Sequence, residues 1–238
     1  MPRILAGLYE RFGLNAYIQG DPAKALLWFR RLERLEPDSI RTLRNLGVIL
    51  LAAGDAAGAE EYLLREERRY GESFHRHSAL ADIAYARGRR EDAARRYEAA
   101  LSDPEAAPAG ARRGDRAFLE ARLRICLDPG AFAAAAEGAE RFKAAEAARD
   151  SGDPRAALAL FEEAVALDPT HWPALNNAGS IALNDLGDPA RALALFKRSF
   201  ALARSAQVAR NVELAGAALA ESPARGRRPA ATQERKTE

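Results

Sequence analysis

Apolar segments alternate with short polar turns along most of the chain. Early in the sequence the turns carry glycine, in Gln19-Gly20-Asp21, Ala53-Gly54-Asp55 and Arg87-Gly88-Arg89, with an apolar segment on either side. The spacing from 20 to 54, and again from 54 to 88, is 34 residues, too long for one average helix and about right for two helices with their turns. Glycine also supplies the positive φ that ends a helix. The pattern therefore predicts repeated helix pairs.

Five units of this kind follow one another in the sequence. They share a small residue in the first segment and an alanine in the second, and four of them place an aromatic residue four positions after that alanine (Phe29, Tyr97, Phe161 and Phe196). The second unit departs from the others, with Leu63 for the aromatic residue, Glu66 where a small residue is usual and Gly71 where proline is expected. The units cover residues 6–39, 40–73, 74–106, 138–171 and 172–205.

This arrangement resembles the tetratricopeptide repeat family, whose pattern has the same small, alanine, aromatic and proline positions. The resemblance implies an all-α fold, an α-solenoid in which each amphipathic helix pair buries its apolar face against the next pair. Small residues are needed where helices approach closely. We therefore expect close helix contacts at Gly13, Gly47 and Gly179, essentially no β-sheet, and turns at Gly20, Gly54, Gly88, Gly152 and Gly187.

The repeat phase breaks between Pro104 and Pro129, where there is room for only one helix, near 112–127. Either this helix is a degenerate repeat within one superhelix, or it caps the first three repeats and the last two form a second module. The cap is favoured, because an open solenoid end exposes an apolar face. The predicted organisation is repeats one to three in 1–106, a loop and the extra helix in 107–137, repeats four and five in 138–205, a capping helix in 206–220 and a disordered tail in 221–238.

Composition agrees with a helical globular chain. Hydrophobic residues make up 48% and charged residues 29%, and with only 7% aromatic residues the core must be built from Ala and Leu, which favour helices. The net charge is +2, and the excess lies in residues 221–238, so residues 1–220 are neutral and carry no nucleic-acid footprint. Arginine outnumbers lysine 32 to 4, and with so much alanine this is typical of a high-GC bacterial gene.

Export and membrane signals are not visible in the sequence. The single cysteine, Cys126, excludes an internal disulfide framework and is predicted to be a buried small apolar residue. The longest charge-free stretch, 169–184, contains two prolines and three asparagines, so no membrane insertion is expected. The apolar run from Ile4 to Tyr9 is too short for a signal peptide. We therefore expect a cytoplasmic protein.

Residues that carry catalysis or bind metals are not arranged in any recognisable pattern. The sequence has no phosphate-binding glycine loop, metal-ligand cluster or nucleophile elbow. His75 and His77 are two positions apart and would point to different faces of a helix, and His171 lies far from both in the sequence. We therefore expect no enzymatic activity, no cofactor and no metal site.

In the tetratricopeptide family, the first helix of each pair lines a concave groove that holds peptides. Asn45 and Asn177 share a repeat position at which family members bond the backbone of an extended peptide, since an amide both donates and accepts. Tyr17 and Tyr85 share another position, and they either stack on ligand side chains or pack between first helices. The resemblance implies these candidate ligand-binding residues: Arg11, Tyr17, Arg41, Arg44, Asn45, Asp82, Tyr85, Asn177, Ser180 and Asn184.

The function predicted from these features is a scaffold or adaptor that binds another protein or peptide. A carboxylate clamp of the kind some family members carry is disfavoured, because Glu10 and Leu14 stand where Lys and Asn are needed, although Arg41 and Arg44 remain partners for an acidic ligand. The alternative is a small-molecule or lipid-binding accessory protein of a bacterial envelope system. Nucleic-acid binding through the basic tail is a third class. The sequence does not indicate the partner's identity or the oligomeric state.

Overall fold

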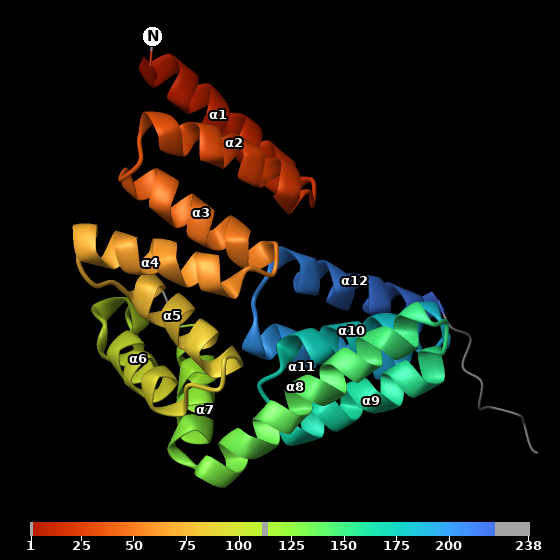
Figure 1. Cartoon of the computed structure of the whole chain (residues 1–238). Helices are drawn as coiled ribbons and strands as arrows, with labels where there is room; N and C mark the ends of the chain where they lie inside the picture. The colour runs from red at the N-terminus through yellow and green to blue at the C-terminus, as the bar shows by residue number, and fades with distance from the viewer. Residues whose placement is uncertain (1, 111–113, 222–238) are drawn as a thin grey trace, which may run out of the picture. The chain divides into compact units, whose positions relative to one another are not determined.

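The computed structural model describes residues 2–110 and 114–221, and all of its regular structure is helical (Figure 1). No strand occurs in these two ranges, so the predicted all-α fold is confirmed. The predicted tail lies outside the described residues except for Glu221, which ends the last helix. The helices are α1 (Pro2–Ile18), α2 (Pro22–Leu35), α3 (Ile40–Ala52), α4 (Ala56–Tyr70), α5 (Phe74–Ala86), α6 (Arg90–Ser102), the 3₁₀-helix η1 (Pro104–Ala106), α7 (Arg116–Leu127), α8 (Pro129–Asp150), α9 (Pro154–Leu167), α10 (Trp172–Asn184), α11 (Pro189–Leu202) and α12 (Ala206–Glu221).

The turns within the helix pairs combine a glycine with a capping aspartate. All five predicted turn glycines have positive φ, between 62° and 83°, a backbone conformation that other residues rarely adopt. In four of the five pairs an aspartate then caps the second helix, as where Asp21 accepts a hydrogen bond from the Lys24 amide and Asp153 accepts one from the Ala156 amide. The predicted turns are confirmed. Gly71, also at positive φ, ends α4 in place of the expected proline.

The chain divides into two compact units after residue 136, and the structure describes residues 2–110 and 114–136 of the first and 137–221 of the second. In the first unit, α1 to α6 are three successive helix pairs, each packed on the next, and α7 packs on α6. Cys126 on α7 is fully buried in the same core cluster as Tyr97 of α6, so its predicted burial is confirmed. The role of α7 as a cap stays a prediction.

The second unit contains repeats four and five with α12 packed on α11. The first helix of repeat four, α8, begins earlier than the repeat boundary at 138: it runs without interruption from Pro129, in the first unit, to Asp150. The Asp128 side chain accepts hydrogen bonds from the amides of Gly130 and Ala131, and the alanine-rich sequence that follows has a high helix propensity. Residues 129–137, grouped with the extra helix in the sequence analysis, therefore extend α8.

Close helix contacts lie at the three predicted glycines. A Cβ atom added at Gly179 would lie 2.7 Å from a ring carbon of the buried Phe196, and one added at Gly47 would lie 3.3 Å from Leu63. At Gly13 the added atom would clash with the ring of Phe29. These contacts confirm that the small and aromatic positions of one repeat pack against each other.

Candidate interaction surface

Arg41 on α3 is bound by carboxylates from two other parts of the first unit. Its Nε and Nη2 atoms donate to Glu36 at 2.9 and 2.7 Å, and its Nη1 atom donates to Glu10 of α1 at 2.9 Å. The hydrogen bonds that Arg41 donates to Glu36 and the charges of both carboxylates raise the pKa of Arg41, so this side chain remains charged. An acidic ligand at Arg41 would therefore compete with two carboxylates that are already bound.

Glu66, the unusual residue of repeat two, is fully buried on α4 and lies between two arginines. Its Oε1 atom accepts hydrogen bonds from Arg44 Nη2 at 3.1 Å and from Arg76 Nη1 at 2.6 Å. Arg76 is also buried, whereas about half of the Arg44 side chain is exposed. Two guanidinium groups against one carboxylate leave one positive charge in excess. The exposed part of this cluster is Arg44, on the first helix of repeat two.

Asp82 and Tyr85 on α5 are both engaged by other residues of the first unit. The Tyr97 hydroxyl donates to Asp82 Oδ1 at 2.6 Å, and the Arg122 guanidinium of α7 lies 3.9 Å from the centre of the Tyr85 ring. Phe132 meets the same ring edge-on at 5.2 Å. Solvent reaches Asp82, yet loss of hydration raises the pKa of its carboxyl, while Arg122 and the Tyr97 hydroxyl act in the opposite direction. At repeat three these two candidates thus interact with α6, α7 and the start of α8.

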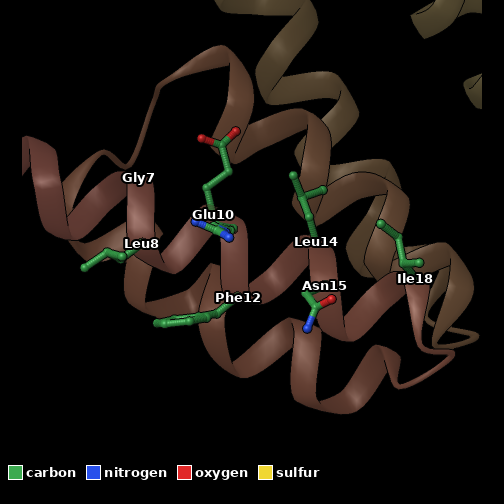
Figure 2. Close-up of a pocket in the computed structure, with 8 residues that line it drawn as sticks. Gly7, Leu8, Glu10, Phe12, Leu14, Asn15 and Ile18 are labelled. Carbon is green, nitrogen blue, oxygen red and sulfur yellow. The ribbon is translucent and has the colours of Figure 1, made fainter.

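The first helix α1 carries a pocket of about 730 Å³ whose lining residues all belong to that helix (Figure 2). Arg11, one of the predicted candidates, contributes to this lining, together with Leu8, Leu14 and Ile18. Tyr17 is exposed on the same helix but does not line the pocket. On α3, Asn45 is half-buried and follows Arg44 directly in the sequence.

The second unit brings its three candidates together on α10. Asn177 is half-buried, Asn184 is exposed, and the Ser180 hydroxyl donates to the backbone oxygen of Asn176 at 3.1 Å. The side-chain amide of Asn176 is itself occupied, since Asn211 Nδ2 of α12 donates to its Oδ1 atom at 2.8 Å. The face of α10 that carries the candidates is therefore polar and uncharged, in contrast to α3.

The ten candidates thus fall into two sets, seven in the first unit and three in the second. Sequence reasoning missed several residues that organise these surfaces, namely Arg76, Arg122 and Asn211. Glu66 was visible as a departure from the repeat pattern, but nothing in the pattern identified its partners. Residues that would coordinate a metal ion do not form any group of three or more in the part of the chain that the structure describes.

The comparison with protein families decides the classification. Residues 11–73 and 142–206 match the family model described as tetratricopeptide repeat, and together they make up more than half of the chain. The chain belongs to the tetratricopeptide repeat family. The two matches fall in repeats one and two and in repeats four and five, whereas repeat three, α7 and the first part of α8 lie between them. The resemblance stated from the sequence is therefore confirmed.

Relatives with the same repeats are found among both curated proteins and solved structures. The chain is 38% identical over 108 residues to the TPR repeat-containing protein PA4299 of Pseudomonas aeruginosa, a match that covers 44% of each protein. The chain thus spans less than half the length of this relative. TTC0263, a TPR protein of Thermus thermophilus, matches over 90% of this chain and 99% of its own with 20% identity and a TM-score of 0.42. YrrB, described as a TPR protein with an unusual peptide-binding site, matches over 87% and 90% with 14% identity and a TM-score of 0.42.

None of the helices in the described ranges is both long enough and apolar enough to cross a membrane.

Proposed function

We propose that this chain is a non-catalytic scaffold that binds a peptide or protein segment along the exposed faces of its first helices. Membership of the tetratricopeptide family supports a role in protein–protein interaction. The observation that carries the proposal is the pair of half-buried asparagines at one repeat position, Asn45 on α3 and Asn177 on α10, with the exposed side chains of Arg44 and Asn184 on the same two helices. Amide side chains can donate to and accept from the backbone of an extended segment.

The excess positive charge beside α3 favours an acidic ligand there. The cluster of Arg44, Glu66 and Arg76 has one positive charge in excess, and the exposed group in it is the Arg44 guanidinium. A carboxylate of the ligand would gain a charge-assisted hydrogen bond there. Arg41 contributes less, because Glu36 and Glu10 already hold it.

The second unit differs in the ligand chemistry that it favours. Its candidates on α10 are two amides and a hydroxyl, and none of them is charged. We propose that this face binds backbone groups of the partner rather than acidic side chains. The two units would then contribute separate contacts to one partner or to two.

Site-specific photo-crosslinking tests this function in cells. A benzophenone amino acid is placed at two exposed first-helix positions, Leu51 of α3 and Asn184 of α10, and at two exposed second-helix controls, Arg69 of α4 and Lys197 of α11. We expect the same partner protein to be crosslinked from one or both first-helix positions and not from the controls. Crosslinks only from the second-helix positions would reject the proposed surface.

A further inference from the structure

Helix α12 begins where the first helix of a sixth repeat would begin. In the first unit α3 begins at Ile40 and α5 at Phe74, 34 residues later. In the second unit α10 begins at Trp172 and α12 at Ala206, again 34 residues later. Helix α12 packs on α11 and also contacts α10 (Figure 1). The helix that follows repeat five therefore continues the series of first helices.

The buried positions of α12 match those of α10. Val208 and Ala215 are buried in α12, and Ala174 and Ile181, each 34 positions earlier, are buried in α10. Because equivalent positions face the core in both helices, the positions between them face the same way in both as well. A residue of α12 can therefore be compared with the residue of α10 that precedes it by 34 positions.

This comparison places a third asparagine in the series of candidates. Asn211 of α12 stands 34 positions after Asn177 of α10, and so it shares the repeat position of Asn177 and of Asn45 on α3. All three asparagines are half-buried. The second unit thus has two asparagines at this position, on two first helices that are in contact.

Two hydrogen bonds orient the side chain of Asn211. Its Nδ2 atom donates to Asn176 Oδ1 of α10 at 2.8 Å, and its Oδ1 atom accepts from Gln207 Nε2 at 3.3 Å. A carboxamide has two N–H groups and two acceptor lone pairs. These bonds use one of each, and they leave one N–H and one lone pair of Asn211 to bind a ligand.

We propose that the ligand-binding surface of the second unit continues from α10 onto α12, and that Asn177 and Asn211 both bond the backbone of one extended peptide segment. The inference rests on the proposed function and adds α12 to its surface. An extended segment offers N–H and C=O groups at regular intervals, and each asparagine can pair with both kinds of group. Neither asparagine is charged, which suits backbone groups rather than ionised side chains.

The distance between neighbouring helices gives the register of the segment. Packed helices lie about 8–10 Å apart, and an extended chain advances about 3.3 Å per residue. The backbone groups bonded by Asn177 and Asn211 would therefore lie about three residues apart in the segment. Leu214, three positions after Asn211, is 51% exposed and stands at the repeat position of Ser180. An apolar side chain of the segment would cover it and gain the burial of both surfaces.

Photo-crosslinking from α12 tests the extension of the surface. A benzophenone amino acid at Leu214 is compared with one at Glu213, which is also exposed but lies two positions after Asn211 and thus on the opposite side of the helix. We expect Leu214 to capture the protein that is captured from Asn184, through the same short segment, and Glu213 not to capture it. Capture from Leu51 or Asn184 without capture from Leu214 would overturn the inference and leave the proposed function standing. Capture from none of these first-helix positions would overturn both.

A synthetic peptide of the crosslinked segment tests the two asparagines. Fluorescence anisotropy measures its affinity for the full chain, for Asn177→Ala and Asn211→Ala, and for the control Glu213→Ala. We expect each asparagine variant to bind about tenfold more weakly, because a backbone group of the peptide loses its partner, and the control to bind like the parent. If Asn177→Ala weakens binding and Asn211→Ala does not, the inference is wrong and the proposed function stands.

Methylation of the peptide backbone separates a ligand contact from a structural role of Asn211. Each peptide N–H is replaced in turn by N–CH₃, which removes one donor. We expect two sensitive positions about three residues apart in the parent, and one of them should lose its sensitivity in Asn211→Ala. If Asn211 only holds α12 against α10, the variant would bind every methylated peptide more weakly by the same factor, and this result would overturn the inference. Circular dichroism checks that the variants are folded, and Asn211→Ser serves as a second variant if Asn211→Ala disrupts α12.

Discussion

Glu66 and Arg76 form a hydrogen-bonded ion pair inside the first unit, with Arg76 Nη1 at 2.6 Å from Glu66 Oε1 and both side chains buried. The pair joins α4, the second helix of repeat two, to α5, the first helix of repeat three. Arg44 of α3 binds the same carboxylate oxygen, so that three helices meet at one side chain. The repeat pattern has a small residue at this position, and here a charged network replaces it.

Replacing Glu66 by Ala should lower the free energy of unfolding by about 3–5 kcal/mol, because it leaves the guanidinium of Arg76 buried without its carboxylate. Urea denaturation monitored by circular dichroism measures the effect. The double variant Glu66→Ala, Arg76→Leu should recover most of the loss, since it removes both charges. A single variant as stable as the parent, or a double variant no better than the single one, would contradict this account of the pair.

Two glycine-to-alanine substitutions in the second unit should change its stability in opposite directions. Gly179→Ala places a Cβ atom 2.7 Å from the Phe196 ring and should destabilise the unit by about 1–3 kcal/mol through overpacking. Gly216→Ala, on α12, meets nothing within 4 Å and should stabilise it by about 0.5–1 kcal/mol through the helix propensity of alanine. Thermal melts of both variants provide the comparison. Equal effects would show that the assigned helix contact at Gly179 is wrong.

The glycine positions were predictable from the sequence, whereas the ion pairs were not. Turn glycines and close-contact glycines follow from the local repeat pattern, because each repeat uses the same residue for the same packing reason. Glu66 breaks that pattern, and its partners depend on which side chains of α3 and α5 reach it after folding. The early start of α8 was missed for a different reason: repeat phase placed the boundary at 138, while the alanine-rich sequence continues the helix back to Pro129.

Glu33 should make the first unit more sensitive to acid. It accepts hydrogen bonds from the Tyr62 hydroxyl at 2.7 Å and from Arg30 Nη1 at 3.0 Å. Partial burial acts to raise the pKa of Glu33, but the hydrogen bonds from Tyr62 and Arg30 and the charge of Arg30 lower it overall. A carboxyl with a lowered pKa in the folded state adds stability above its unfolded pKa, about 4.3, and this stability is lost as pH falls through the folded value.

Comparison of Glu33→Gln with the parent isolates this contribution from those of other carboxyls. At neutral pH the parent should be more stable than the variant by about 1.5–3 kcal/mol, the range for hydrogen bonds to a charged group. The difference should shrink as the pH falls below about 4.3. Urea denaturation at a series of pH values gives both quantities. A difference that stays constant down to strongly acidic pH would remove Glu33 as the cause.

Truncation tests whether α7 caps the first three repeats. Leu119 and Cys126 of α7 are buried in the cluster that contains Tyr97 of α6, so their removal exposes apolar surface. Residues 1–128 should therefore fold alone as a cooperative helical unit, and residues 1–106 should aggregate or melt at lower temperature. Light scattering and thermal melts distinguish the two fragments. If 1–106 is as stable and monodisperse as 1–128, then α7 is not a cap.

Only part of the candidate surface was accessible to sequence reasoning. The repeat register placed Asn45 and Asn177 at equivalent positions on first helices, because the register determines which face of a helix a residue occupies. The engagement of Tyr85 by Arg122 was not predictable, since Arg122 lies on a helix outside the repeat pattern. The tyrosine at the equivalent position of repeat one, Tyr17, remains exposed. Two residues at one repeat position thus differ because only one has α7 beside it.

Isothermal titration calorimetry with the crosslinked partner tests the central claim most directly. Asn45→Ala and Asn177→Ala should each change the free energy of unfolding by no more than about 0.5 kcal/mol. If the replaced asparagine contacts the partner, binding should lose about 1–3 kcal/mol of free energy, because a backbone group of the ligand is left unpaired. Arg44→Ala should also weaken binding and reduce its salt dependence if the ligand is acidic. Arg69→Ala and Lys197→Ala, on second helices, are the matched controls. Weaker binding in at least one asparagine variant with unchanged controls is the predicted result, and unchanged affinity in both asparagine variants and in Arg44→Ala would contradict the proposed first-helix surface.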